Sequence, residues 1–345
     1  MDLRLYLLTR LTGYALKVTI GNPGKLFTVL LKSGNSVFWV ADSDCAYAFC
    51  ANKQKYIPSQ STTSKGSTSE KTFFFVGSEE SVFGINWNDD IIMERMDGRK
   101  VKFPNSIFGT PTYVSWFSWR EYEKIDGAFG ITFPDINNTF NDNPIKEAIR
   151  NNIIPAIITV ALPPQRSNAF GSLTLGEIDK NLCIEKEQIP EMVSGNRLTF
   201  RYLSLSMGIV TFSSSFKTAT AYIHTTKAYI NVPEELMQDI VQYTNAQMNE
   251  STQNYMVNCN ELFEPLEITT THNTYSIQPE NFIYKQNRFD KQCVLAIRSE
   301  KSAFDRVTLG IPFLNQYCAV MEPNAHRITF LPMTTNFMQR FVNSA

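Results

Sequence analysis

The chain has 345 residues, and its 32 lysines and arginines against 33 aspartates and glutamates give a formal net charge of −1. This length suffices for two domains of common size, and 43% hydrophobic residues, with 25 phenylalanines and 14 tyrosines, can form a large core. The charge balance indicates no nucleic-acid partner, and no apolar run reaches the roughly 18 residues of a membrane helix.

The N-terminal segment, Met1 to Leu11, is apolar but contains Arg4 and Arg10. It is too short and too charged for the core of a signal peptide. Two explanations stay open: the chain begins within the mature protein, or the gene model lacks its true first exon.

Short apolar runs bounded by turn residues predict β-strands along the whole chain. The first, residues 15–20, alternates apolar and polar side chains and ends at the turn Gly21–Gly24. Further strands are expected at 27–31, 37–40, 155–162, 173–176 and 327–331. This spacing favours an all-β architecture over alternating strands and helices.

Two helices are expected among these strands. One is the brief segment Pro144–Arg150, and the other is Pro233–Met248, which starts with a proline and two glutamates, as helix N-termini prefer. The stretch Gln54–Lys71 is rich in serine, threonine and lysine and predicts a solvated loop or hairpin.

Two segments have the same design: an apolar strand, a short turn rich in hydroxyl groups, and another apolar strand. They are residues 27–40, with Lys32-Ser33-Gly34 in the turn, and residues 221–230, with His224-Thr225-Thr226. The first resembles the Asp-Thr-Gly active-site loop of pepsin-like aspartic proteases, and the second resembles the matching loop of the other lobe.

The resemblance extends over nearly the whole chain. Ile125–Ile131 is similar to the segment behind the first active-site loop, and Gly171–Asp179 to the strand that leaves the first lobe. Thr308–Cys318 matches a late family segment, with Ile311 where the family usually has aspartate. The resemblance implies a mostly β, bilobal pepsin-like fold with few short helices and two pseudo-twofold-related β-barrel lobes. These lobes are expected at residues 1–165 and 166–345, with the crossing near Pro163–Ser167.

The catalytic pair of this family is absent at the matching positions, because Lys32 and His224 stand where the two aspartates are expected. The reaction needs two carboxylates that share one proton and activate a water molecule between them. A protonated lysine has no acceptor lone pair, and His224 lacks an acidic partner. We therefore expect no catalytic residues, no metal, no cofactor and no proteolysis. A nucleophilic Lys32 is a weaker hypothesis.

The remaining loop residues are expected to support the architecture. The resemblance assigns Ser33 and Thr225 to hydrogen bonds across the lobes, with Gly34, Thr226 and Trp39 as cleft and core support. Thr226 occupies a position whose backbone conformation is expected to favour glycine. Lys32 is expected to point into a wet cleft, since burial of its charge is costly.

Other residues carry weaker predictions. The family's flap tyrosine has no counterpart in the flap residues Val76, Gly77 and Ser78, because Gly77 occupies its position. Asp126 is expected to bond to backbone groups. The other carboxylates near the predicted cleft or loops, Asp42, Asp44, Asp89 and Asp90, are not expected to rebuild a catalytic pair. His272 and His326 are isolated and are expected to be structural or exposed.

Six cysteines permit three disulfides in 15 pairings. The resemblance implies Cys45–Cys50 and Cys259–Cys293, and the remaining Cys183 and Cys318 resemble a bridge of nematode members. Disulfides predict an oxidising compartment, so the protein is expected to be secreted or to lie in a lysosome-like lumen. The sequons at Asn137 and Asn249 are compatible with a glycoprotein.

The leading hypothesis is a monomeric, inactive homologue, or pseudoenzyme, that holds a peptide or protein in the cleft between its lobes without cleaving it. One alternative is an aspartic-type endopeptidase with residual or atypical activity. The other is a structural secreted glycoprotein whose cleft has no role.

Overall fold

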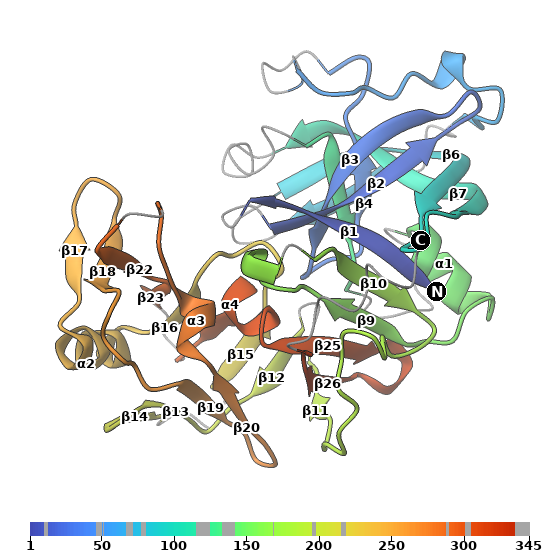
Figure 1. Cartoon of the computed structure of the whole chain (residues 1–345). Helices are drawn as coiled ribbons and strands as arrows, with labels where there is room; N and C mark the ends of the chain where they lie inside the picture. The colour runs from blue at the N-terminus through green and yellow to red at the C-terminus, as the bar shows by residue number, and fades with distance from the viewer. Residues whose placement is uncertain are drawn as a thin grey trace.

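The computed structural model describes residues 1–9, 13–45, 50, 52–66, 72–76, 81–114, 125–132, 142–167, 169–194, 198–214, 219–287, 290–300 and 305–334. In these residues the chain forms 26 β-strands, in four sheets, and four α-helices. Figure 1 shows two lobes: an N-terminal lobe in blue and cyan and a C-terminal lobe in yellow and orange, with green and red strands between them. The predicted mostly β, bilobal fold is confirmed.

The largest sheet has 13 strands in the order β11-β26-β25-β9-β10-β1-β2-β3-β8-β4-β7-β6-β5. Their bounds are β1 (Asp2–Thr9), β2 (Gly13–Ile20), β3 (Lys25–Lys32), β4 (Phe38–Val40), β5 (Thr72–Val76), β6 (Ser81–Glu94), β7 (Lys100–Val114), β8 (Gly127–Gly130), β9 (Ile158–Ala161), β10 (Gly171–Leu175), β11 (Glu191–Met192), β25 (Tyr317–Glu322) and β26 (Arg327–Pro332).

The C-terminal lobe contains three smaller sheets. One consists of β12 (Thr199–Arg201), β15 (Thr220–Ile223), β24 (Val307–Leu309), β16 (Ile230–Pro233) and β23 (Ile297–Glu300). The second consists of β14 (Val210–Ser213), β13 (Ser204–Met207), β19 (Leu266–Thr269) and β20 (Thr274–Ile277). The third consists of β17 (Gln247–Asn249), β18 (Asn254–Asn258), β22 (Gln292–Leu295) and β21 (Ile283–Tyr284).

A five-strand pattern occurs once in each lobe. The orders β2-β3-β8-β4-β7 and β12-β15-β24-β16-β23 have the same succession of antiparallel, parallel, antiparallel and parallel pairs. β3 and β15 are the strands that lead into the two predicted loops. Each lies between an antiparallel neighbour and a parallel one, so the two strands occupy equivalent places in the two lobes. The duplication expected from the two similar segments is present in the strand topology.

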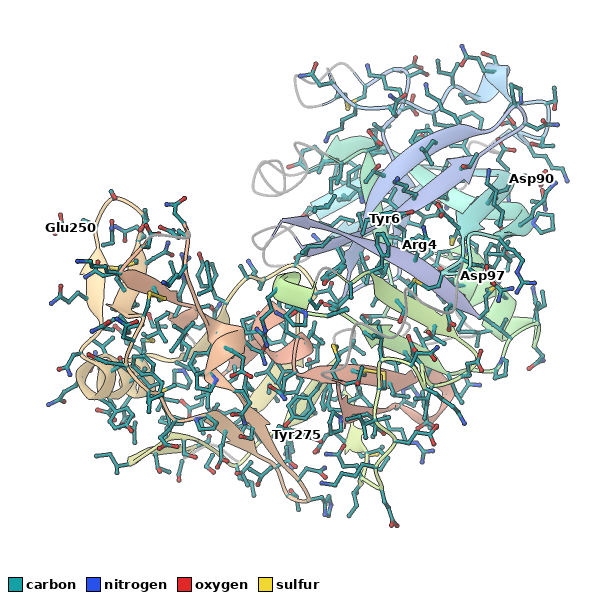
Figure 2. All side chains as sticks on the ribbon, viewed as in Figure 1. Arg4, Tyr6, Asp90, Asp97, Glu250 and Tyr275 are labelled. Carbon is teal, nitrogen blue, oxygen red and sulfur yellow. A yellow bond between two sulfur atoms is a disulfide. The ribbon has the colours of Figure 1, made fainter. Side chains whose placement is uncertain are left out.

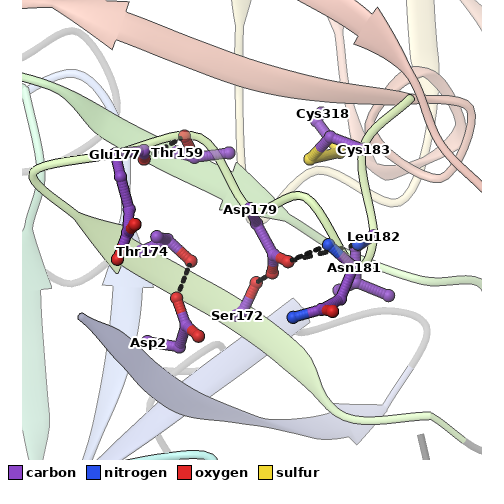
Figure 3. Close-up of a disulfide and its surroundings, with 10 residues drawn as sticks. All are labelled: Asp2, Thr159, Ser172, Thr174, Glu177, Asp179, Asn181, Leu182, Cys183 and Cys318. Carbon is purple, nitrogen blue, oxygen red and sulfur yellow. Dashed lines mark hydrogen bonds between the residues drawn. A yellow bond between two sulfur atoms is a disulfide. The ribbon is translucent and has the colours of Figure 1, made fainter. Parts of the chain in front are cut away.

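A second region of the large sheet joins distant parts of the chain. β1, β9, β10, β25, β26 and β11 lie side by side, so N-terminal, middle and C-terminal strands share one layer (Figure 1). The Cys183–Cys318 disulfide links the segment after β10 to β25 (Figure 3). Next to it, the Asp179 carboxylate accepts hydrogen bonds from the Ser172 hydroxyl and from the backbone N–H of Leu182.

Three disulfides are present: Cys45–Cys50, Cys183–Cys318 and Cys259–Cys293. These are the pairs that the family resemblance implies. A buried carboxylate further secures the C-terminal part, because Glu191 accepts hydrogen bonds from Thr270, Asn273 and Tyr275. Figure 2 shows Tyr275 among the side chains in the lower part of the C-terminal lobe.

The helices are short. α1 (Pro144–Arg150) matches its predicted bounds. α2 (Glu234–Thr244) ends earlier than predicted, because Asn245 adopts a left-handed conformation and the chain then enters β17. α3 (Pro279–Phe282) and α4 (Ile311–Leu314) were not predicted, since four residues are too few for a helical periodicity. No helix in the described residues is long and apolar enough to cross a membrane.

The strands predicted at 15–20, 27–31, 37–40, 155–162, 173–176 and 327–331 are confirmed as β2, β3, β4, β9, β10 and β26, with shifted ends. In contrast, β1 was not predicted, although its Leu3 and Leu5 are fully buried. The predicted loop 54–71 contains no strand in its described part, residues 54–66.

Candidate functional site

The first of the two similar loops follows β3, which ends at Lys32. β3 runs parallel to β8, with Lys32 opposite Gly130, and the chain leaves the loop along β4 on the other side of β8. Gly34 has a φ of 95°, a left-handed conformation that is costly for any residue with a Cβ atom. Its N–H donates to Thr132 Oγ1 at 2.8 Å, which ties the loop to the segment after β8.

The second loop follows β15, which ends at Ile223 opposite Leu309 of β24. The His224 N–H donates to the Leu309 carbonyl at 3.0 Å. His224 Nδ1 lies 3.1 Å from Thr226 Oγ1 and accepts from the Thr226 N–H at 3.4 Å. In the tautomer that accepts these bonds at Nδ1, the ring proton lies on Nε2.

The two loops are joined by reciprocal hydrogen bonds. Ser33 N–H donates to Thr225 Oγ1 at 3.0 Å, and Thr225 N–H donates to Ser33 Oγ at 3.1 Å. The Ser33 hydroxyl donates to the Ile223 carbonyl at 2.9 Å, and the Thr225 hydroxyl donates to the Leu31 carbonyl at 2.8 Å. Each hydroxyl therefore accepts one bond and donates one bond across the lobes. These are the two residues to which the resemblance assigns this role.

Lys32 and His224 each precede one member of the joined pair, so both lie where the lobes meet. The expectation that Lys32 points into water is wrong, because its residue is only 6% exposed. Lys32 has interaction partners, as the burial of an ammonium group requires. His224 is half-buried, and its ring lies 6.2 Å from that of Tyr222.

The expectation of a glycine-like conformation at Thr226 is also wrong. Thr226 is not among the described residues with positive φ, whereas Gly34 in the first loop is. The contact between the Thr226 hydroxyl and the His224 ring accompanies this ordinary backbone conformation. The two loops therefore turn differently at corresponding positions.

Two glycines, one at the end of β8 and one between β24 and α4, allow the segments behind the loops to pass at close range. A Cβ atom on Gly130 would lie 2.5 Å from the carbonyl oxygen of Asn35, and one on Gly310 would lie 2.3 Å from that of Lys227. Asn35 and Lys227 are each three residues beyond Lys32 and His224. The same close approach therefore occurs in both lobes, at glycines within the segments that carry the family resemblance.

Asn143 is a site residue that sequence reasoning missed. Its Nδ2 donates to the carbonyl of Ser36 at 2.8 Å and to that of Gly130 at 3.0 Å. Its Oδ1 caps α1 by accepting from the N–H groups of Ile145 and Lys146. An asparagine just before a helix that starts with proline is a recognisable N-cap signal, but its link to the loop is not readable from sequence.

Asp126 and Trp39 have the predicted structural roles. Asp126 accepts from the N–H of Thr28 and from that of Gln54, both at 2.8 Å, so it joins β3 to the following loop region. Trp39 is 2% exposed and belongs to the core.

The other carboxylates singled out by sequence form local hydrogen bonds. Asp89 is fully buried and accepts from Tyr56 at 2.8 Å and from Thr63 at 2.6 Å. Burial, and then the adjacent Asp89 carboxylate, raise the pKa of Tyr56. Asp42 accepts from the backbone N–H of Asp44 at 2.8 Å in a turn. Asp90 forms an ion pair with Lys102 at 2.7 Å.

Only part of the predicted flap lies within the described residues. β5 and β6 form an antiparallel hairpin in which Val76 pairs with Ser81. Gly77 and Ser78 lie outside the described residues, so the absence of a flap tyrosine stays a prediction from sequence.

No group of three or more histidine, cysteine, aspartate or glutamate residues that could hold a metal ion occurs in the described part of the chain. A pocket of about 30 Å³ opens where Tyr14, Arg166 and Ala228 approach one another. This volume holds a small number of water molecules.

Comparisons with known proteins identify the family. A family model described as eukaryotic aspartyl protease matches residues 13–333, and the chain belongs to this family. It is 25% identical to Aspartic protease 6 of Caenorhabditis elegans, over 92% of this chain and 81% of that protein. It is 22% identical to human gastricsin, with the same coverage, and 23% identical to bovine pepsin A, over 93% of this chain and 84% of that protein.

Proposed function

We propose that this chain is a pepsin-like protein without endopeptidase activity, which binds a peptide or protein segment between its lobes. The observation that carries the proposal is the pair of residues beside the cross-lobe bonds. Lys32 and His224 precede Ser33 and Thr225, at the positions where the family resemblance expects the two catalytic aspartates.

Loss of proteolysis follows from the chemistry of these two groups. Cleavage by this family needs one ionised carboxylate to take a proton from water and one protonated carboxyl group to polarise the amide. Lysine has no acceptor while protonated, and the lone pair on His224 Nδ1 faces Thr226. Two catalytic groups that act together lose most of their effect when either is removed.

Retention of a binding role is supported by the intact connection between the lobes. The four cross-lobe hydrogen bonds and the shared sheet support the two-lobed arrangement without the aspartates. The three disulfides favour an oxidising location, either extracellular or lysosome-like.

The direct test is incubation of the purified chain with a mixed peptide library from pH 3 to pH 8, with and without pepstatin. We expect no new termini by mass spectrometry at any pH. Pepstatin-sensitive cleavage by the unmodified chain would instead favour the alternative of a residual or atypical endopeptidase.

A second test restores both acids in the variant Lys32→Asp/His224→Asp. We expect little peptidase activity even then, because the predicted flap lacks a tyrosine and Thr226 replaces the loop glycine. Activity close to that of an active family member would show that only the two acids are missing.

A further inference from the structure

We infer that Asn249 is a site of N-linked glycosylation, at which an oligosaccharide is attached to the side-chain amide in the turn between β17 and β18. The inference does not depend on the proposed binding function, because no residue of this turn belongs to the two loops. It requires entry of the chain into the secretory pathway, which the three disulfides favour. The second sequon, at Asn137, lies outside the described residues, so the inference is limited to Asn249.

The turn that carries Asn249 is exposed over its whole length. β17 ends at Asn249, and β18 begins at Asn254, which pairs with Asn249. Every residue from 247 to 253 is exposed. β17 and β18 lie at the outer end of the C-terminal lobe, where Figure 2 labels Glu250 (Figures 1 and 2). An oligosaccharide attached at this turn extends into solvent and displaces no packed side chain.

The side-chain amide of Asn249 is oriented by the two residues that complete the turn. Its Oδ1 accepts from the Ser251 N–H at 3.1 Å, from the Ser251 hydroxyl at 2.7 Å and from the Thr252 N–H at 3.2 Å. Two of these donors are backbone amides, so the atom that they contact is the oxygen and not the nitrogen. Nδ2 forms no hydrogen bond with any described residue, and its two protons are free on the exposed side of the turn.

This arrangement suits the chemistry of glycan transfer. Nδ2 forms a bond to C1 of the sugar while the bond from C1 to the pyrophosphate of a lipid-linked donor breaks. The lipid pyrophosphate leaves, and Nδ2 gives one proton to a base of the transferase. Hydrogen bonds donated to Oδ1 polarise the amide and make the protons on Nδ2 more acidic. The Ser251 hydroxyl forms the shortest of these bonds, which gives a physical role to the hydroxyl that the sequon requires.

The hydrogen bonds of this turn are local. All of the donors to Oδ1 lie within three residues of Asn249. Side chains of asparagine readily form such bonds with the backbone that follows them, without help from distant parts of the fold. The same geometry is therefore accessible to the chain before the C-terminal lobe has folded.

The far end of β18 supplies an internal comparison. Asn258 is exposed, and its Oδ1 accepts from the backbone N–H of Asn260 at 3.0 Å, so it also lies in a local turn. The residue two positions after it is an asparagine, which has no hydroxyl to donate. Asn258 therefore shares the exposure and the turn but lacks the sequon, and we expect it to stay unmodified.

The first experiment locates the modification on the full chain. The chain, preceded by a secretion signal, is translated with endoplasmic-reticulum microsomes, and the protease-protected product is digested with trypsin. Peptide N-glycosidase F in heavy-oxygen water then converts each glycosylated asparagine into a labelled aspartate, which mass spectrometry locates. We expect the label at Asn249 and none at Asn258. A protected chain without label at Asn249 would overturn the inference.

The second experiment separates the sequon from the turn with variants. Asn249→Asp keeps an oxygen that accepts the same bonds but has no Nδ2, and Ser251→Ala removes only the hydroxyl. Both should abolish the label, whereas Ser251→Thr should retain it. Thr252→Ala is the matched control, because it leaves the sequon and the N–H donor to Oδ1 in place and should be labelled like the wild type.

The readout from microsomes does not require that a variant reach a stable fold. A label that persists at Asn249 in Ser251→Ala would overturn the assignment to N-linked transfer at a sequon. Equal loss of the label in Thr252→Ala and Ser251→Ala would overturn the role given to the Ser251 hydroxyl.

Discussion

The loops at Lys32 and His224 are joined by reciprocal hydrogen bonds, but the residues that pack against the far side of each loop differ: they are charged at the first loop and apolar at the second. Behind the first loop, Asn143 joins Ser36 to α1, and Asp142 on the same segment pairs with Arg150 at 2.7 Å and with Lys146 at 3.4 Å. Behind the second loop stands α4, whose four side chains are buried and carry no ionisable group.

The comparison separates what the shared architecture needs from what it tolerates. Both loops keep a hydroxyl group that bonds across the lobes, and both are approached closely by a glycine, Gly130 in β8 and Gly310 just after β24. They differ in backbone conformation at Gly34 and Thr226, and in the residue before the hydroxyl, which is a lysine in one loop and a histidine in the other. The connection between the lobes therefore depends on amides and hydroxyls and does not require a pair of acids.

The largest loss of stability is expected when the cross-lobe hydrogen bonds, which both loops share, are removed. Ser33→Ala combined with Thr225→Val removes all four bonds and leaves two buried N–H groups without acceptors. We expect a loss of about 4 kcal/mol in the free energy of unfolding, measured by urea denaturation, because each unsatisfied buried group costs about 1–3 kcal/mol. Thr211→Val, at an exposed position on β14, should change stability by less than about 0.5 kcal/mol. A double variant as stable as this control would show that the bonds do not secure the lobes.

The next effect concerns the first loop alone. Asn143→Ala removes the cap of α1 and both bonds to the loop, so we expect a loss of about 3 kcal/mol. Asn143→Asp keeps the capping oxygen and loses only the two donors, so thermal unfolding should place it between the wild type and the alanine variant. If both variants unfold at the same temperature, the cap contributes nothing and the loop bonds carry the whole effect.

The difference between Gly34 and Thr226 gives a smaller test. No atom lies within 4 Å of a Cβ atom added to Gly34, so Gly34→Ala carries only the conformational cost of about 1–2 kcal/mol at a φ of 95°. Thr226→Gly should also destabilise, by about 1 kcal/mol, because it frees the unfolded chain at a residue with ordinary φ. Stabilisation by Thr226→Gly in calorimetry would mean that the second loop does prefer a left-handed residue.

Much of this architecture was readable from sequence. The strands around both loops, the bounds of α1 and the backbone-bonding role of Asp126 follow local patterns of apolar residues, prolines and turns. The family resemblance supplied the disulfide pairs and the order of the lobes, which local patterns cannot provide.

The missed features depend on contacts between residues far apart in the sequence. β1 carries Asp2 and Arg4 along an apolar segment, and it becomes a strand because it pairs with β10, about 170 residues later. Lys32 is buried although lysines usually remain exposed, and its environment is set by tertiary packing. Asn143 is readable as a cap, but its bonds to Ser36 and Gly130 exist only once the two segments meet.

The smallest expected effect tests the charged support of the first loop through its pH dependence. Burial, and then the Asp142 carboxylate, raise the pKa of Glu147 above its ordinary value of 4.5. Between 4.5 and the raised pKa the folded chain holds a proton that the unfolded chain has released, so this residue lowers stability as pH rises through that window. Glu147→Gln should therefore match the wild type below pH 4 and melt about 1–2 °C higher at pH 7, as expected for a fraction of a kcal/mol in a chain of this size.

The variant Asp90→Asn should instead melt below the wild type at pH 7. Hydrogen bonding to Lys102 lowers the pKa of Asp90, so the stabilisation by this carboxylate is present at pH 7 and is lost as pH falls. A Glu147→Gln variant that melts below the wild type at pH 7 would mean that the attraction of the Arg150 charge for the Glu147 carboxylate outweighs its burial, so that the first loop would depend on this acid for support.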